Sequence, residues 1–84
     1  MDTVFKIQKG RALAWTLSQG DTLRNLRVDS YAALCNRGAM ECRKAAPSKL
    51  LIYNESGNVR RAIEFALDHD TGQVIPMEQD PSEF

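Results

Sequence analysis

Two carboxylates flank the only histidine of the chain in the segment Asp68-His69-Asp70-Thr71-Gly72. Carboxylates at alternate positions followed by a glycine are typical of calcium-binding loops, where oxygen ligands alternate along the chain. Here Gly72 stands at the fifth position of such a loop, which needs an oxygen ligand, and Gln79 stands at the twelfth, which needs a bidentate glutamate. The pattern therefore predicts a solvated turn rich in Asp and Gly, and no metal site.

No set of residues in the sequence fits a known catalytic arrangement either. Asp70-Thr71-Gly72 has the residue types of the aspartic protease triplet, but only twelve residues follow it, too few for a substrate cleft and flap. His69 is the only histidine, so any Ser–His or Cys–His pair would have to use it. The five glycines stand singly and form no phosphate-binding loop. We therefore expect a non-enzymatic protein without a cofactor.

The two cysteines, Cys35 and Cys42, are seven residues apart in a segment with helical periodicity. That spacing separates them by about 10.5 Å along a helix axis, whereas bridged Cα atoms lie within about 7 Å. Both fall on the expected core face of that helix, where an ionised thiolate is disfavoured. The first residues also lack the charged-then-apolar order of a secretory signal, and we expect a cytoplasmic protein with reduced thiols and no membrane contact.

The length sets a further limit on function. A chain of 84 residues and 9.4 kDa buries only about 63% of its unfolded surface, which is enough for one small domain. A core of this size cannot enclose a cofactor within a barrel or form two lobes around a cleft. Composition is typical of a globular protein, with 43% hydrophobic and 26% charged residues. We expect one domain over residues 1–77 and an acidic polar tail over residues 78–84.

Charge is distributed unevenly along a chain whose net charge is zero. All eleven Lys and Arg lie between Lys6 and Arg61, so residues 3–61 carry +7, while residues 62–84 carry −6. Such a layout suggests a surface for nucleic acid or acidic protein that the C-terminal segment partly masks. The alternative is an ordinary mixed surface, on which positive and negative residues are separated along the sequence but not in space. If the hairpin loop and the helix end lie together, six cations form one basic patch: Arg24, Arg27, Arg43, Lys44, Arg60 and Arg61.

The first third of the chain has the period-two alternation of half-buried strands. Residues 5–7 and 13–17 alternate apolar with other residues, glycine-containing turns follow each run, and residues 22–28 suggest a third strand. Three antiparallel strands are expected. Trp15 is more typical of a core residue than of a base-stacking platform. Whether it shares a face with the aromatic residues of the other strands stays open.

A helix is the most secure element. Asp29 or Ser30 can cap it, and Pro47 cannot continue it. Between them, small and apolar residues recur at three- and four-residue steps, from Tyr31 to Ala46. Arg37 and Glu41 are four apart on its polar side and can pair.

The second half predicts further strands. Residues 49–54 read as a central strand, and Glu55-Ser56-Gly57-Asn58 as a hairpin loop. Residues 59–67 fit a strand or a helix, and the short connection favours the strand. In that strand Ile63, Phe65 and Leu67 would be buried, with Arg60, Ala62, Glu64 and Ala66 on the other face. Residues 73–77 form a short last strand, which Pro76 confines to an edge.

From Leu13 to Arg61 the order of elements resembles a group of small bacterial and phage domains of unknown function. The resemblance is carried by Ala14-Trp15-Thr16-Leu17, by the alanine pairs 32–33 and 45–46, and by the strand and hairpin over residues 51–60. It implies one helix packed across a small antiparallel sheet, an outline also used by phage-encoded inhibitors that act by binding. The additional N-terminal strand and the acidic segment after Ala62 depart from it.

Together these observations predict an α+β fold with one helix on a small antiparallel sheet, in the order ββ(β)αββ with a short extra edge strand. The expected function is a small binding module that acts by protein–protein contact, as an inhibitor or adaptor of a nucleic-acid-handling partner. The alternative is direct, weak nucleic-acid binding through residues 3–61, modulated by the acidic C-terminus. A homodimer through a sheet edge is a further expectation, because unpaired strand edges attract other strands.

Overall fold

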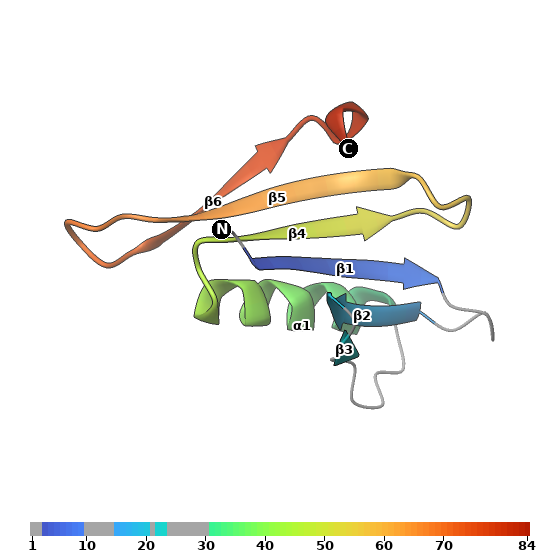
Figure 1. Ribbon diagram of the computed structural model, residues 1–84, viewed down its shortest axis with the longest axis horizontal. Coiled ribbons are helices and arrows are strands. Elements are labelled where there is room, and N and C mark those ends of the chain that lie inside the picture. The colour runs from blue at the N-terminus through green and yellow to red at the C-terminus, as the bar shows by residue number, and fades with distance from the viewer. Residues whose placement is uncertain (1–2, 10–14, 21, 24–30) are drawn as a thin grey trace.

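The chain folds as one helix against a six-stranded mixed sheet in the computed structural model, which describes residues 3–9, 15–20, 22–23 and 31–84 (Figure 1). In chain order the elements are β1 (Thr3–Lys9), β2 (Trp15–Gln19), β3 (Thr22–Leu23), α1 (Tyr31–Lys44), β4 (Ser48–Tyr53), β5 (Val59–Leu67), β6 (Val74–Gln79) and the short 3-10 helix η1 (Pro81–Glu83). The strand order is β3-β2-β1-β4-β5-β6. The α+β class is thus confirmed. The expected third strand is present at Thr22–Leu23, and the rest of its predicted range lies outside the described residues.

The sequence predicted a wholly antiparallel sheet, and this prediction is wrong for one pair of neighbouring strands. Four strand pairs are antiparallel, but β1 and β4 run parallel, from Thr3 beside Ser48 to Ile7 beside Ile52. The reason is the direction of α1. The helix carries the chain back to the end of the sheet where β1 starts, so β4 runs in the same direction as β1, as in other helical crossovers.

Small residues on α1 let it lie close to the sheet. Gly38 is buried, and a Cβ atom at that position would come within 3.0 Å of Leu50 Cδ1 and 3.2 Å of Ile7 Cδ1. The helix covers β1, β2 and β4, while β5 and β6 extend beyond it. Its polar side carries the expected ion pair between Arg37 and Glu41, at 3.4 Å. Both candidate N-cap residues lie outside the described residues.

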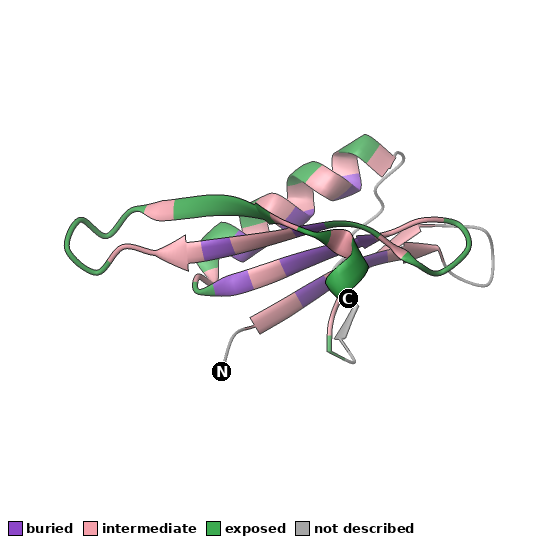
Figure 2. Ribbon diagram, turned by 90° about the horizontal axis from the view of Figure 1, so that it is seen from above, coloured by how far each residue is buried: buried purple, intermediate pink, exposed green. Residues whose placement is uncertain are grey.

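The core lies between α1 and the centre of the sheet. In Figure 2 the buried residues run along the middle of the strands and the facing side of α1, and exposed residues mark the outer hairpins. The fully buried large side chains are Phe5, Ile7, Leu17, Leu34, Leu50, Ile52 and Phe65. We call this side of the sheet the helix face and the opposite side the second face.

The ambiguous segment 59–67 is a strand, as the sequence favoured. β5 pairs with β4 from Ser48–Phe65 to Tyr53–Val59, and Phe65 is buried on the helix face as predicted. Ala62 lies on the second face, opposite Phe65, as predicted, and is fully buried there. Ala62 pairs with Leu51 there, and η1 packs against β5. By contrast, Ile63 and Leu67, which the sequence predicted to be buried, are only partly buried.

A register shift interrupts the pairing of β4 and β5 near the hairpin. Arg61 is opposite Ile52, but the next pair joins Tyr53 to Val59, so Arg60 is an extra residue on β5. Such a bulge locally breaks the alternation of side chains between faces. The strict alternation expected for this strand therefore ends at Arg60.

The C-terminal third forms a hairpin and a short return. The turn at residues 68–72 is closed by the Gly72 N–H, which donates to the Asp68 carbonyl oxygen at 2.7 Å, and Gly72 has a φ of 73°. β6 is the predicted edge strand with Pro76, but it extends to Gln79, so the segment expected as a polar tail begins in regular structure. η1 follows it, and Asp80 caps η1 by accepting a hydrogen bond from the Ser82 N–H at 3.0 Å.

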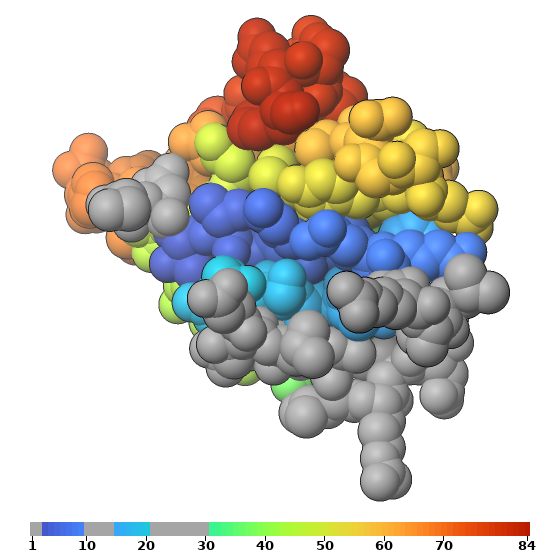
Figure 3. All heavy atoms as spheres, turned by 45° about the vertical axis from the view of Figure 1, so that its right-hand side comes forward, coloured from blue at the N-terminus to red at the C-terminus, as the bar shows by residue number. Residues whose placement is uncertain are grey.

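The last residue returns to the sheet. The Lys49 ammonium lies 4.9 Å from the centre of the Phe84 ring, which places η1 over the second face beside the start of β4. Figure 3 shows this arrangement, with the C-terminal residues in red above the yellow-green residues of β4.

Candidate functional site

A groove opens where β5 and β6 extend past α1 on the helix face. It encloses about 280 Å³, slightly below the roughly 300–1,000 Å³ of small-molecule sites. Seven residues line it, from three elements: Ala39 and Arg43 on α1, Arg61, Ile63 and Phe65 on β5, and Pro76 and Glu78 on β6. We call it the α1–β5–β6 groove.

The floor of the groove is apolar because of the sheet register. Ile63 is opposite Glu78 and Phe65 is opposite Pro76, so alternate residues of both strands face α1 together. Ile63 is half-buried and packs against the core, while Pro76 is exposed. A partner side chain resting here would therefore contact carbon atoms from both strands.

Arg43 forms one wall of the groove. It stands in the last turn of α1, where a cation interacts favourably with the helix dipole, and its guanidinium carbon lies 5.7 Å from the centre of the Phe65 ring. Its side chain is exposed, and it makes no ion pair with any of the described residues. Arg43 thus offers hydrogen-bond donors beside an aromatic surface.

Arg61 and Glu78 form the other wall. The Arg61 Nε donates to Glu78 Oε1 at 3.0 Å, and the Nη2 atom contacts the same oxygen. This hydrogen bond raises the pKa of the Arg61 guanidinium. Both side chains are more than half exposed, and exposed ion pairs contribute only about 0–1 kcal/mol. Another carboxylate could therefore replace Glu78 at little cost.

The expected basic patch is only partly assembled. Arg43 and Arg61 line the same groove, but the hairpin loop and the C-terminal end of α1 lie at opposite ends of the sheet, so the arrangement that the patch required does not occur. Lys44 is exposed in the last turn of α1, and Arg60 stands at the bulge. Arg24 and Arg27 lie outside the described residues.

Sequence reasoning missed Glu78, which it assigned to the tail. Counting outward from the turn at residues 68–73 would have found it, because that hairpin places Glu78 opposite Ile63 and diagonal to Arg61. Ala39 had no such signal. It is one of many small residues in α1, and only the extension of β5 and β6 beyond the helix exposes it to the groove.

An aromatic pair lies at the N-terminal end of α1. The rings of Trp15 and Tyr31 are 4.8 Å apart and tilted by 59°. Burial raises the pKa of the Tyr31 hydroxyl, while the nearby Arg60 guanidinium acts in the opposite direction. Trp15 packs against the core, and the buried Phe5 and Phe65 lie on the same face of the sheet. These three aromatics form no exposed stacking platform.

The cysteines occupy different environments, and both are free thiols. Cys42 is fully buried, and its carbonyl oxygen accepts a hydrogen bond from Ser48 Oγ at 2.6 Å. Burial raises the pKa of the Cys42 thiol from 9 to about 11. Cys35 is only half-buried, so the expectation that both thiols would lie within the core holds for Cys42 alone.

Stability should fall in alkali because of Cys42. Between pH 9 and 11 the unfolded thiol loses its proton while the folded thiol keeps it, so the unfolded state gains stability as the pH rises. We expect a loss of roughly 2–3 kcal/mol from this group by pH 11. Urea melts at pH 8 and pH 11 measure it, with Cys42→Ala losing this dependence and Cys35→Ala retaining it. An unchanged dependence in Cys42→Ala would contradict the assignment.

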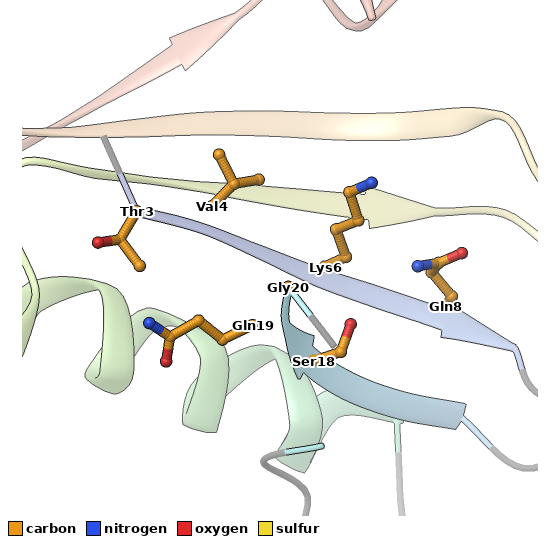
Figure 4. Close-up of a pocket in the computed structure, with 7 residues that line it drawn as sticks. All are labelled: Thr3, Val4, Lys6, Gln8, Ser18, Gln19 and Gly20. Carbon is orange, nitrogen blue, oxygen red and sulfur yellow. The ribbon is translucent and has the colours of Figure 1, made fainter. Parts of the chain in front are cut away.

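A second hollow lies over β1 and β2 (Figure 4). It is lined by Thr3, Val4, Lys6, Gln8, Ser18, Gln19 and Gly20. Val4, Lys6 and Gln8 point to the second face, whereas Thr3 and Gln19 point toward the helix face. The lining residues include one cation and no carboxylate, histidine or cysteine. This hollow therefore offers no acid–base pair, and its lining is more polar than that of the groove.

The uneven charge along the chain is balanced in part by contacts between residues distant in sequence. Besides Arg61 with Glu78, Lys9 pairs with Glu55 at 3.0 Å, and Lys49 stands opposite Glu64 in the sheet. The Arg61–Glu78 and Lys49–Glu64 neighbours bring two acidic residues of segment 62–84 against the basic strands. Within the described residues, the opposite signs are thus interspersed.

Among the described residues, no group of three His, Cys, Asp or Glu side chains is arranged to hold a metal ion. No helix there is both long and apolar enough to cross a membrane. Comparison with protein-family models, curated proteins and solved structures found no match to the chain.

Proposed function

We propose that the protein is a small non-enzymatic binding module that acts by protein–protein contact through the α1–β5–β6 groove. The observation that carries the proposal is the combination of an apolar floor with arginine walls. Aromatic and arginine side chains are enriched in the centres of protein interfaces. A volume of about 280 Å³ suits a few side chains of a partner rather than a cofactor.

Charge favours protein over nucleic acid as the ligand. Affinity for a phosphate backbone comes from several Lys and Arg that neutralise phosphates together. Among the described residues, Lys9, Arg37 and Arg61 already pair with carboxylates, and Lys49 lies against Phe84. Base-stacking sheets of RNA-binding domains expose several aromatic side chains on one face, whereas Phe5, Trp15 and Phe65 pack in or against the core here.

The edge of β6 is a poor site for strand addition. The Asp68 N–H donates to the Gln73 carbonyl oxygen at 2.8 Å, which fixes the alternation of hydrogen bonds along β5 and β6. In this alternation Pro76 belongs to a pair without hydrogen bonds, so its nitrogen, which has no hydrogen, faces the free edge. Edge prolines block the approach of another strand. Side chains of the groove therefore provide the proposed contact.

A variant that fills the groove tests the proposal. Ala39→Trp should place an indole over Ile63 and Pro76, whereas Met40→Trp adds the same ring at an exposed position that does not line the groove. We expect a stoichiometric partner to be captured from lysate of the source cells by the wild-type chain and by Met40→Trp, and capture to fall at least about tenfold for Ala39→Trp.

Thermal melts of both variants establish that they are folded. Equal capture by Ala39→Trp and Met40→Trp would contradict the groove as the contact surface. Turnover of a small molecule by the isolated protein, with no partner captured, would contradict the non-enzymatic assignment.

A further inference from the structure

The charges around the groove specify the chemistry of its ligand. The charged residues that line the groove are two arginines, Arg43 and Arg61, and one glutamate, Glu78. Arg43 has no acidic partner among the described residues, and its donors lie at the rim beside Phe65. The groove therefore has an unmatched positive charge next to an apolar floor.

Glu78 occupies the position that a ligand carboxylate would take on Arg61. It contacts the guanidinium through one oxygen, Oε1, at both Nε and Nη2. Both partners are more than half exposed, so water and solute carboxylates can reach the pair. Arginine commonly binds carboxylates with two donors, and an exposed ion pair such as this one contributes only about 0–1 kcal/mol, so a ligand carboxylate can compete with Glu78.

From this arrangement we infer that the groove binds an acidic peptide segment with a central apolar side chain, and that Glu78 is an internal carboxylate which the segment displaces from Arg61. The inference rests on the proposed function and adds the chemistry of the partner. The apolar side chain would lie on Ile63 and Pro76. Its flanking carboxylates would bind Arg43 on one side and Arg61 on the other.

Two labelled hexapeptides test the inference by fluorescence anisotropy. Both have leucine and phenylalanine at the centre, one with flanking glutamates and the other with flanking lysines. We expect the glutamate peptide to bind the wild-type chain at least about tenfold more tightly, because like charges across an interface are strongly disfavoured. Its affinity should also decrease as salt is added.

Variants assign the effect to the named residues. Glu78→Gln frees Arg61 and should raise affinity for the glutamate peptide by about two- to fivefold, since an exposed ion pair is removed. Arg43→Gln should lower it by a similar factor. The control is Lys6→Gln, which removes an equal charge from the second face and should change affinity less than about twofold.

Absence of binding by the glutamate peptide, equal binding of the lysine peptide, or no effect of Glu78→Gln would each overturn the inference. These outcomes differ from failure of the proposed function. If Ala39→Trp abolishes capture of the cellular partner while the peptides show no charge preference, the groove is the contact surface and only its assigned ligand chemistry is wrong.

Discussion

Replacing Phe65 with alanine should lower the free energy of unfolding by about 3–5 kcal/mol. Phe65 is 2% exposed, packs with the core beneath α1 and supports the floor of the groove. Alanine leaves a cavity between β5 and the helix, and a close-packed core only partly closes such a space. Urea denaturation followed by circular dichroism measures the loss.

Phe84→Ala provides the matched control. It removes the same side chain from the same third of the chain, but Phe84 is 45% exposed and contacts Lys49. Its loss should be below about 1 kcal/mol. A cost below about 1 kcal/mol for Phe65→Ala as well would contradict the burial of β5 and the position of the groove.

Gly38→Leu should lower the free energy of unfolding by about 3 kcal/mol, the upper part of the range for overpacked cores. Even a Cβ atom at this position meets Leu50 at 3.0 Å, Ile7 at 3.2 Å and Leu17 at 3.4 Å. The remaining atoms of a leucine have no space unless α1 moves away from the sheet. Leucine has a high helix propensity, so the loss can be attributed to packing.

Gly38→Ala separates the effect of core packing from the effect of helix propensity. One methyl group meets the flexible ends of Leu50, Ile7 and Leu17, and alanine is favoured over glycine in a helix by about 1 kcal/mol. We expect its free energy of unfolding to stay within about 1 kcal/mol of wild type. If Gly38→Leu is as stable as Gly38→Ala, the close approach of α1 to the sheet is incorrect.

The elements could be predicted because their patterns are local. Small residues at helical spacing between Tyr31 and Pro47 defined α1, and the four-residue loop before Val59 favoured a strand over a helix for β5. Pro76 marked β6 as an edge. Each of these signals lies within about 15 residues of the element it specifies.

The direction of β4 could not be predicted in the same way. The alternation of Phe5 and Ile7 indicates which side chains face the core, but it is the same whether the neighbouring strand is parallel or antiparallel. The burial of Ala62 was missed for a related reason. The cover on the second face comes from Leu51 and from η1, which begins nineteen residues after Ala62 in a segment expected to be a tail.

The groove combines residues that no local pattern connects. Arg43 and Phe65 are brought together only when α1 packs on the sheet that contains β5. Arg61 meets Glu78 through the register of a hairpin, so this contact could have been found by counting from the turn. The net charge of the two halves did not predict it, because the fold places opposite signs side by side.

Methyl cross-saturation in the complex with the captured partner tests the central claim most directly, because it reports which methyl groups lie against the partner. Ala39 and Ile63 line the groove, whereas Val4 lies over β1 on the second face. We predict that saturating the partner reduces the Ala39 and Ile63 methyl signals and leaves those of Val4 unchanged. Loss of the Val4 signals with Ala39 and Ile63 unaffected would contradict the groove as the binding surface.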